Sequence, residues 1–203
     1  MFNERLIVIS SPDRITDEVS IWQALFEAGL YRLHVRKPTW NHEEIGLLLH
    51  AVPSKWRNRV VVHHWFDACG MYRLAGIHAS YQNFDFLKFG QYLQESFSVS
   101  CSVHSWQELE QISKKCHYVF MGPIFDSISK MGYSQNHLLH SIPETFKESK
   151  IYALGGIDTS RLHQVLEMGY YGIGVLGYIW EQPSNAVHRF VHLLDLIQQI
   201  KTV

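Results

Sequence analysis

Two apolar runs near the C-terminus end in glycines: IYALGGI at residues 151–157 and GIGVLG at residues 172–177. Glycine lets the backbone come close to a bound anion and takes φ values that other residues avoid. A helix-like stretch follows each run, and the N-terminus of a helix offers unpaired N–H groups at the positive end of its dipole. The two runs therefore predict a phosphate site, although tight turns alone also explain either run taken singly.

Short apolar or β-branched runs recur along the whole chain and alternate with amphipathic stretches. No low-complexity tract and no linker rich in Pro, Gly or Ser interrupts the alternation. Strict alternation of this kind is typical of parallel strands joined by helices. The predicted strands are residues 6–10, 31–35, 60–63, 76–79, 97–102, 118–121, 151–154 and 172–176.

Helix start signals fall between these strands. Ser105 with Glu108 forms a capping box, and Asp158 or Thr159 can cap the helix after the seventh strand. These signals place helices where the alternation requires them. The predicted helices are residues 17–28, 41–51, 66–74, 84–94, 105–114, 138–146, 159–168 and 185–200.

Two glycines mark helix ends, since Gly29 and Gly169 stand where a C′ glycine relieves left-handed backbone strain before the next strand. A doubly wound open sheet would show the same alternation. Eight units, with glycine loops after the last two strands, favour the closed form, in which those loops commonly bind phosphate. The sequence therefore predicts an α/β fold, a single-domain (β/α)8 TIM barrel over residues 1–203.

Composition permits this fold and excludes several partners. The chain has 203 residues, of which 46% are hydrophobic, enough for the core of one barrel domain. The formal net charge is -1 and there is no Lys/Arg block, so the sequence predicts no binding to nucleic acid or to a membrane surface. No run has transmembrane length, no signal segment opens the chain, and three cysteines lack metal-type spacing. We expect a cytoplasmic protein. The sequence leaves open whether it forms a homodimer.

Histidines gather at the predicted strand ends, where barrels place their chemistry. His34, His63, His64, His78 and His104 lie at or directly after strands two to five. Histidine moves protons near neutral pH, so several rings facing one cavity can abstract and return a proton. Imidazole also binds transition metals, but a hydrolytic metal barrel normally adds carboxylates, and these strand ends offer few. We therefore expect acid–base chemistry and no metal site.

Polar groups suited to an anion follow two other strand ends. Arg36 and Lys37 come directly after strand two and can clamp a phosphate or diphosphate, although surface solvation also explains such a pair. Ser127, Ser129 and Lys130 follow strand six and offer two hydroxyls and a cation to one phosphate. Local cations are therefore expected to hold an anionic ligand.

One loop carries the most specific motif of the chain: GPIF at residues 122–125, followed by SISK at 127–130. It resembles the Gly-Pro-Ile-Phe-x-Thr-x-Thr-Lys loop of the thiamin phosphate synthase and TenI family of (β/α)8 barrels. The resemblance covers nearly the whole chain. GGI at 155–157, GIGV at 172–175, GIH at 76–78 and SVHS at 102–105 also fit this family.

The resemblance implies a site with two sides. Thiamin precursors would be the ligands, and the thiazole phosphate would be bound by Ser127, Ser129, Lys130, Gly156 and Gly177. The pyrimidine diphosphate side would comprise Arg36, Lys37, His63, His64 and Ser102.

The diphosphate side departs from the family pattern. His63 and His64 stand where the family has Asn-Asp, and Gln82 or Asn83 stands where a second carboxylate is expected. Magnesium prefers oxygen ligands, so two histidines replace an acid poorly. Both expected magnesium carboxylates are therefore missing from the sequence.

These departures favour a TenI-like thiazole tautomerase, which isomerises a thiazole carboxylate phosphate without a metal and uses one or more of His34, His78 and His104. Against it, such tautomerases carry a histidine where Pro123 stands. The alternative is a thiamin phosphate synthase, which joins hydroxymethylpyrimidine diphosphate to thiazole phosphate. A catalytically silent barrel that binds a precursor or a partner protein is a third hypothesis. No cofactor is expected, except Mg²⁺ if the protein is a synthase.

Overall fold

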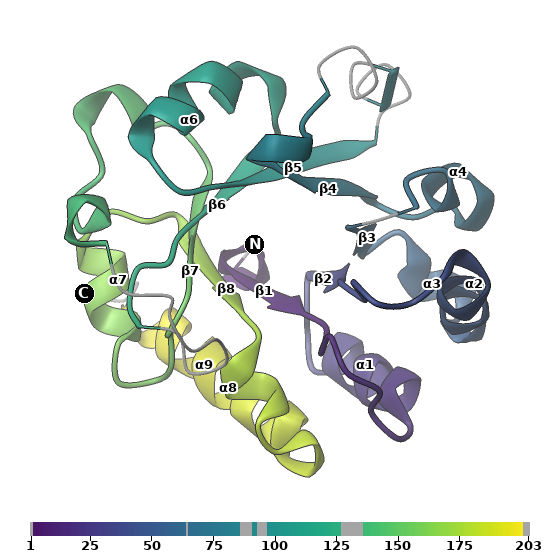
Figure 1. Ribbon diagram of the computed structural model, residues 1–203. Coiled ribbons are helices and arrows are strands. Elements are labelled where there is room, and N and C mark those ends of the chain that lie inside the picture. The colour runs from purple at the N-terminus through teal and green to yellow at the C-terminus, as the bar shows by residue number, and fades with distance from the viewer. Residues whose placement is uncertain (1, 64, 86–90, 93–96, 127–135, 201–203) are drawn as a thin grey trace.

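Eight parallel strands close into a barrel in the order β1 to β8 (Figure 1). The computed structural model describes residues 2–63, 65–85, 91–92, 97–126 and 136–200. Because β1 pairs with both β2 and β8, the open sheet is excluded and the predicted (β/α)8 barrel is confirmed. The strands are β1 (Leu6–Ile9), β2 (Arg32–Val35), β3 (Val60–Val62), β4 (Gly76–Ser80), β5 (Ser98–Val103), β6 (Tyr118–Met121), β7 (Ile151–Leu154) and β8 (Gly172–Val175).

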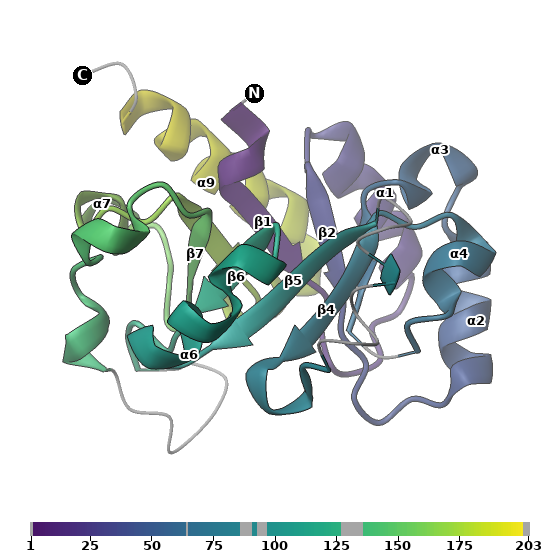
Figure 2. The same ribbon diagram turned by 90° about the horizontal axis from the view of Figure 1, so that it is seen from above.

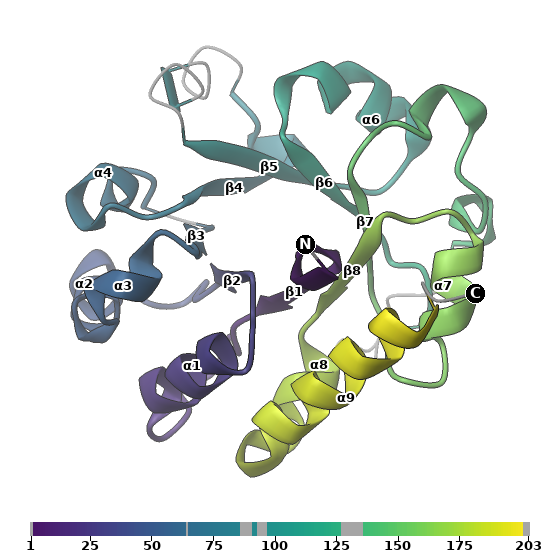
Figure 3. The same cartoon turned by 180° about the vertical axis from the view of Figure 1, so that it is seen from behind.

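Helices surround the strands, as the view from above and the view from behind both show (Figures 2 and 3). The long helix α9 packs against α1, α7 and α8. Its buried residues Phe190, Leu193, Leu194 and Ile197 follow the helical spacing that forms one apolar stripe. The helices are α1 (Glu18–Glu27), α2 (His42–Ala51), α3 (Ser54–Arg57), α4 (Ala68–Tyr72), α6 (Trp106–Ile112), α7 (Leu162–Glu167), α8 (Gly177–Trp180) and α9 (Ala186–Ile200).

The two C′ glycines behave as predicted, since Gly29 and Gly169 have φ values of 104° and 93°. Ser105 caps α6 by accepting a hydrogen bond from the backbone of Glu108. Asp158 does not cap α7. That helix begins only at Leu162, and the Asp158 carboxylate instead accepts backbone hydrogen bonds from the turn before it.

The helix predicted at residues 138–146 was wrong. Two short 3-10 turns, η4 (His137–Leu139) and η5 (Glu144–Phe146), take its place. Pro143 precedes the second turn, and proline disfavours a helical conformation in the residue before it and lacks a backbone N–H. The helix predicted at 84–94 falls largely outside the described residues. No helix among those that are described has the length and apolar character required to cross a membrane.

A small cluster of apolar and aromatic side chains fills the inside of the barrel. It comprises Ile7, Ile9, Tyr118, Phe120 and Tyr152, all nearly excluded from solvent. A Cβ at Gly174 would lie 2.7 Å from Cε1 of Phe120, so this glycine makes room for the aromatic ring. The second glycine run therefore serves packing as well as any ligand.

Candidate active site

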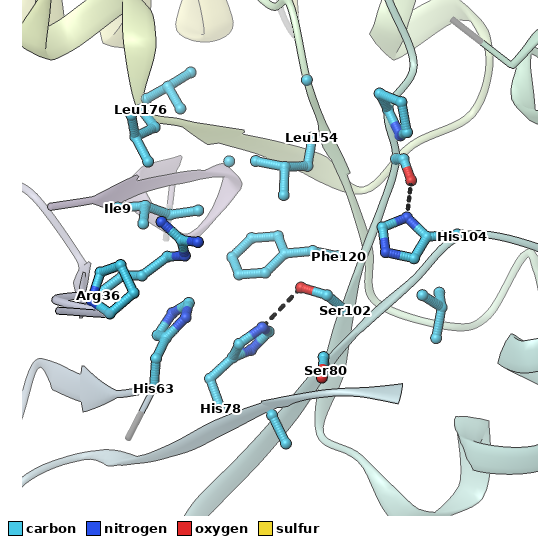
Figure 4. Close-up of a pocket in the computed structure, with 18 of the residues that line it drawn as sticks. Ile9, Arg36, His63, His78, Ser80, Ser102, His104, Phe120, Leu154 and Leu176 are labelled. Carbon is cyan, nitrogen blue, oxygen red and sulfur yellow. Dashed lines mark hydrogen bonds between the residues drawn. The ribbon is translucent and has the colours of Figure 1, made fainter. Parts of the chain in front are cut away.

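A cavity of about 740 Å³ opens at the C-terminal ends of the strands. Parallel barrels place their active sites at this face. Figure 4 looks into the cavity and shows polar side chains from β2 to β5 opposite apolar ones from β7 and β8. Every strand supplies a lining residue at or directly after its last position: Ile9, Arg36, His63, Ser80, His104, Gly122, Leu154 and Val175.

Three imidazoles form what we call the histidine half of the mouth: His34 on β2, His63 directly after β3 and His78 on β4. His34 is fully buried, and His63 and His78 line the cavity above it. Nδ1 of His34 lies 2.9 Å from Nε2 of His63, and its Nε2 lies 2.7 Å from the Tyr118 hydroxyl. The predicted catalytic residue His34 is therefore a buried partner of His63, and no part of it lines the cavity.

Burial lowers the pKa of His34 well below its ordinary value, and the neighbouring His78 and Arg32 lower it further. A charged imidazole would be costly in this position because nothing solvates it. His34 is therefore neutral at neutral pH, with one ring nitrogen protonated and the other able to accept a hydrogen bond.

Hydrogen bonds fix the tautomer of a neutral His78. The Ser100 hydroxyl donates its single proton to the Ile77 carbonyl, so at 2.8 Å it must accept from Nδ1 of His78. Nε2 then carries no proton and accepts from the Ser102 hydroxyl, also at 2.8 Å. Ser102, predicted on the diphosphate side, thus belongs to the histidine half through His78 (Figure 4).

His104 lies on a separate part of the cavity wall, after β5. Its Nδ1 is hydrogen-bonded to the carbonyl of Gly122, the residue that follows β6. A carbonyl only accepts, so Nδ1 carries the proton, and Nε2 of the neutral ring is the basic nitrogen. The sequence placed His104 beside the other histidines, whereas the structure turns it toward the loop after β6.

Arg36 and Lys37 point to different places, although they are adjacent in sequence. Arg36 lines the cavity. Lys37 is buried, donates to Oε2 of Glu18 at 2.6 Å and to the Asp13 carbonyl at 2.8 Å, and does not line the cavity. Burial lowers the pKa of Lys37 and raises that of Glu18, while their pairing opposes both effects. The structure gives Lys37 a structural ion pair in place of the predicted diphosphate contact.

Backbone forms the opposite wall, which we call the glycine half: Gly122, Gly155, Gly156 and Gly177. Gly155 and Gly156 have φ values of 101° and 63°, which non-glycine residues rarely adopt. A Cβ at Gly156 would lie 2.3 Å from the carbonyl oxygen of Asp126. Gly155 and Gly156 are therefore required by conformation and by space, and their bare backbone lines the cavity.

Sequence reasoning missed an aromatic part of the wall. Trp65 has a positive φ of 47° and stacks on His42, with ring centroids 5.0 Å apart and an interplanar angle of 11°. Both rings line the cavity and suit a flat heteroaromatic ligand. The available signal was the position of Trp65, two residues after His63 at the end of a predicted strand.

The sequence of the chain matches a known protein family. A family model described as thiamine monophosphate synthase (TMP-TENI) matches residues 6–179. The chain belongs to the thiamine monophosphate synthase family. It is 21% identical over 185 residues to a thiamine-phosphate synthase of Dictyoglomus turgidum, covering 87% of this chain and 83% of that protein.

Solved structures agree with membership of the thiamine monophosphate synthase family. A thiamine phosphate pyrophosphorylase from Bacteroides thetaiotaomicron has 29% identity and a TM-score of 0.74, over 96% of this chain and 98% of that chain. One from Pyrococcus furiosus shares the fold, with 16% identity and a TM-score of 0.78 over 98% and 97% of the two chains. The family resemblance inferred from the sequence motifs is confirmed.

The residues predicted to bind the thiazole phosphate fall into two groups. Gly156 and Gly177 line the cavity. Ser127, Ser129 and Lys130 lie outside the described residues, as does His64 on the diphosphate side. Phosphate binding by all of these residues stays a prediction.

The described wall of the cavity does not fit Mg²⁺. Among its described lining residues, Asp67 is the one carboxylate, and it accepts a hydrogen bond from the Tyr92 hydroxyl at 3.2 Å. Asn83 also lines the cavity. Either Asn83 or Gln82 stands where the second carboxylate is expected. Magnesium requires several oxygen ligands in octahedral geometry, and the histidine half offers nitrogen.

Proposed function

We propose that the protein is a TenI-like thiazole tautomerase that holds a thiazole phosphate at the glycine half and moves a proton with His104. One observation carries this proposal: the His104 ring is hydrogen-bonded to the carbonyl of Gly122, directly before Pro123. The family resemblance puts the tautomerase histidine at the position of Pro123. His104 brings the same functional group to this corner of the mouth from the neighbouring strand.

The proposed base is Nε2 of His104. Tautomerisation to the aromatic ring breaks a C–H bond at one position of the ligand and forms a C–H bond at another, with no net change in protons or electrons. Nε2 takes the first proton, and the Gly122 carbonyl, which accepts from Nδ1, stabilises the resulting imidazolium. The same ring then returns a proton at the second position, so neither a metal nor a redox partner is required.

The other polar groups position the ligand. The glycine half and the loop of Ser127, Ser129 and Lys130 would hold the phosphate, which keeps the reacting ring beside His104. Ser102, oriented by His78 at 2.8 Å, offers a hydroxyl to a polar group of the ring. Holding the reactants in one geometry supplies a large part of the rate increase of such a reaction.

An assay with both synthase substrates, with and without magnesium, tests this proposal. We expect no thiamin phosphate under either condition, and conversion of the thiazole carboxylate phosphate to its aromatic tautomer without added magnesium. Magnesium-dependent formation of thiamin phosphate contradicts the tautomerase-only proposal. Binding of thiazole phosphate with no turnover of any substrate would support the silent barrel instead.

Synthase activity is the second candidate function. It is favoured by the likeness to the pyrophosphorylase of Bacteroides thetaiotaomicron, at 29% identity over almost the full length of both chains. Arg36 at the cavity wall is the described cation that could receive a diphosphate. In that case Arg36→Ala should abolish thiamin phosphate formation and leave thiazole phosphate binding intact.

A further inference from the structure

Three imidazoles from neighbouring strands meet at one point of the barrel mouth. One ligand nitrogen from each of His34, His63 and His78 lies within 4.8 Å of the others. The ring centroids of His63 and His78 are 4.2 Å apart, and the His34 centroid lies 5.1 and 5.2 Å from them. No other group of three potential metal ligands of this kind occurs among the described residues.

Outer partners hold two of these rings in place. The Tyr118 hydroxyl lies 2.7 Å from Nε2 of His34, and the Ser100 hydroxyl lies 2.8 Å from Nδ1 of His78. Ser100 is in turn hydrogen-bonded to the Ile77 carbonyl. Metal-binding histidines characteristically use one ring nitrogen for such an outer hydrogen bond and present the other to the ion. Here these outer bonds leave Nδ1 of His34 and Nε2 of His78 as the ligand atoms.

The type of donor atom fits a transition metal. Imidazole nitrogen suits zinc, cobalt, nickel and copper ions, whereas magnesium and calcium require oxygen ligands. The replacement of carboxylates by histidines therefore changes which metal the mouth can hold, rather than only removing a metal.

The distances between the ring nitrogens allow a metal site after small movements of the side chains. Zinc binds histidine nitrogen at about 2.0–2.1 Å, so two ligand nitrogens of a tetrahedral site lie roughly 3.3 Å apart. Nδ1 of His34 and Nε2 of His63 already lie 2.9 Å apart. An ion would replace the proton that these two nitrogens share, and it would replace the Ser102 hydroxyl as the partner of Nε2 of His78.

We propose that His34, His63 and His78 bind a zinc-class dication whose fourth position opens into the cavity. Three neutral ligands leave the ion its full charge, so water or an anionic oxygen of a ligand would occupy that position. Arg36 on the same wall adds positive charge and favours an anion there. The site is independent of the proposed base, because His104 lies elsewhere and is hydrogen-bonded to Gly122.

Titration of the metal-stripped full chain with Zn²⁺ and Co²⁺ tests this site. We expect one high-affinity ion per chain and a tetrahedral Co²⁺ absorption spectrum, both without any substrate. His63→Ala and His78→Ala should each weaken binding at least tenfold, whereas Ser102→Ala should bind equally or more tightly because a competing hydroxyl is gone. His104→Ala is the matched control, a cavity-lining histidine outside the cluster, and should bind like the parent.

His63 is the main test residue because it is only partly buried, so its loss should leave the fold intact. Circular dichroism of each variant checks this. The proposal is overturned if the folded parent binds no ion, if the double variant His63→Ala/His78→Ala binds like the parent, or if His104→Ala loses the ion as they do. None of these outcomes bears on tautomerase activity, which is measured separately.

Discussion

The two halves of the barrel mouth are built in opposite ways. In the glycine half, a Cβ at Gly122 or Gly156 would lie 2.2 or 2.3 Å from a backbone oxygen, so space and conformation dictate the residue. In the histidine half, hydrogen bonds with Tyr118 and Ser100 orient two of the imidazoles. The first half presents backbone groups, which would hold an anion at any pH. The second presents imidazole nitrogens, which would bind the proposed metal ion.

Replacing His104 should give the largest effect and separate chemistry from anchoring. We expect His104→Gln to lower kcat for the tautomer by about 10²–10⁴-fold, the usual contribution of a general acid or base. Thiazole phosphate should still bind with the affinity of the parent, because the glycine half is unchanged. Steady-state kinetics and calorimetry measure the two quantities, and an equal loss of both would show that His104 serves binding.

Removing Glu18 should show that Lys37 has a structural role. Glu18→Ala leaves the buried Lys37 unpaired and should lower the free energy of unfolding by about 3–5 kcal/mol. Denaturant unfolding measures this change. Glu27→Ala, on the exposed end of the same helix, is the control and should change stability by no more than about 0.5 kcal/mol. The double change Glu18→Leu/Lys37→Met removes both charges and should restore most of the loss.

Adding a methyl group to the glycine half should weaken phosphate binding and leave the histidine half unchanged. Gly156→Ala forces a positive φ on alanine and a contact with the Asp126 carbonyl, which should cost about 1–3 kcal/mol. Affinity for thiazole phosphate and the melting temperature should both fall. Gly70→Ala, where an added Cβ meets no atom within 4 Å, should leave affinity unchanged. Equal behaviour of the two variants would refute the steric account of this half.

The Ser102 hydroxyl should give the smallest effect. Ser102→Ala removes the hydroxyl that we propose contacts the ligand ring, a hydrogen bond worth about 0.5–1.5 kcal/mol, so we expect a two- to tenfold rise in KM with little change in kcat. Ser102→Thr keeps the hydroxyl and should restore the parent value. A large fall in kcat for Ser102→Ala would instead move the proton chemistry into the histidine half.

Much of the fold could be predicted from sequence because strand signals are local. The strands at 118–121 and 151–154 have the predicted bounds, and the remaining strands differ by one residue at one or both ends. The helix at 138–146 failed because its amphipathic pattern outweighed Pro143 in the prediction. A proline inside a periodic run should have limited that assignment.

The site was harder to predict, since neighbours in sequence face different ways. Arg36 lines the cavity while Lys37 turns to Glu18, and no local signal names a partner 19 residues earlier. Side chains alternate along a strand, so His34 and Arg32 point to the same side of β2, toward the inside of the barrel. This alternation made the burial of His34 predictable in part. The meeting of His34, His63 and His78 could not be read from sequence, because it depends on strand register.

The central claim is that the mouth anchors a thiazole phosphate on one side and moves a proton beside it without magnesium. The direct test is the conversion of the thiazole carboxylate phosphate to its aromatic tautomer, followed by NMR with the purified chain and no added magnesium. Our account predicts catalysed conversion. A chain that leaves this compound unchanged, yet forms thiamin phosphate from both synthase substrates when magnesium is added, would contradict it.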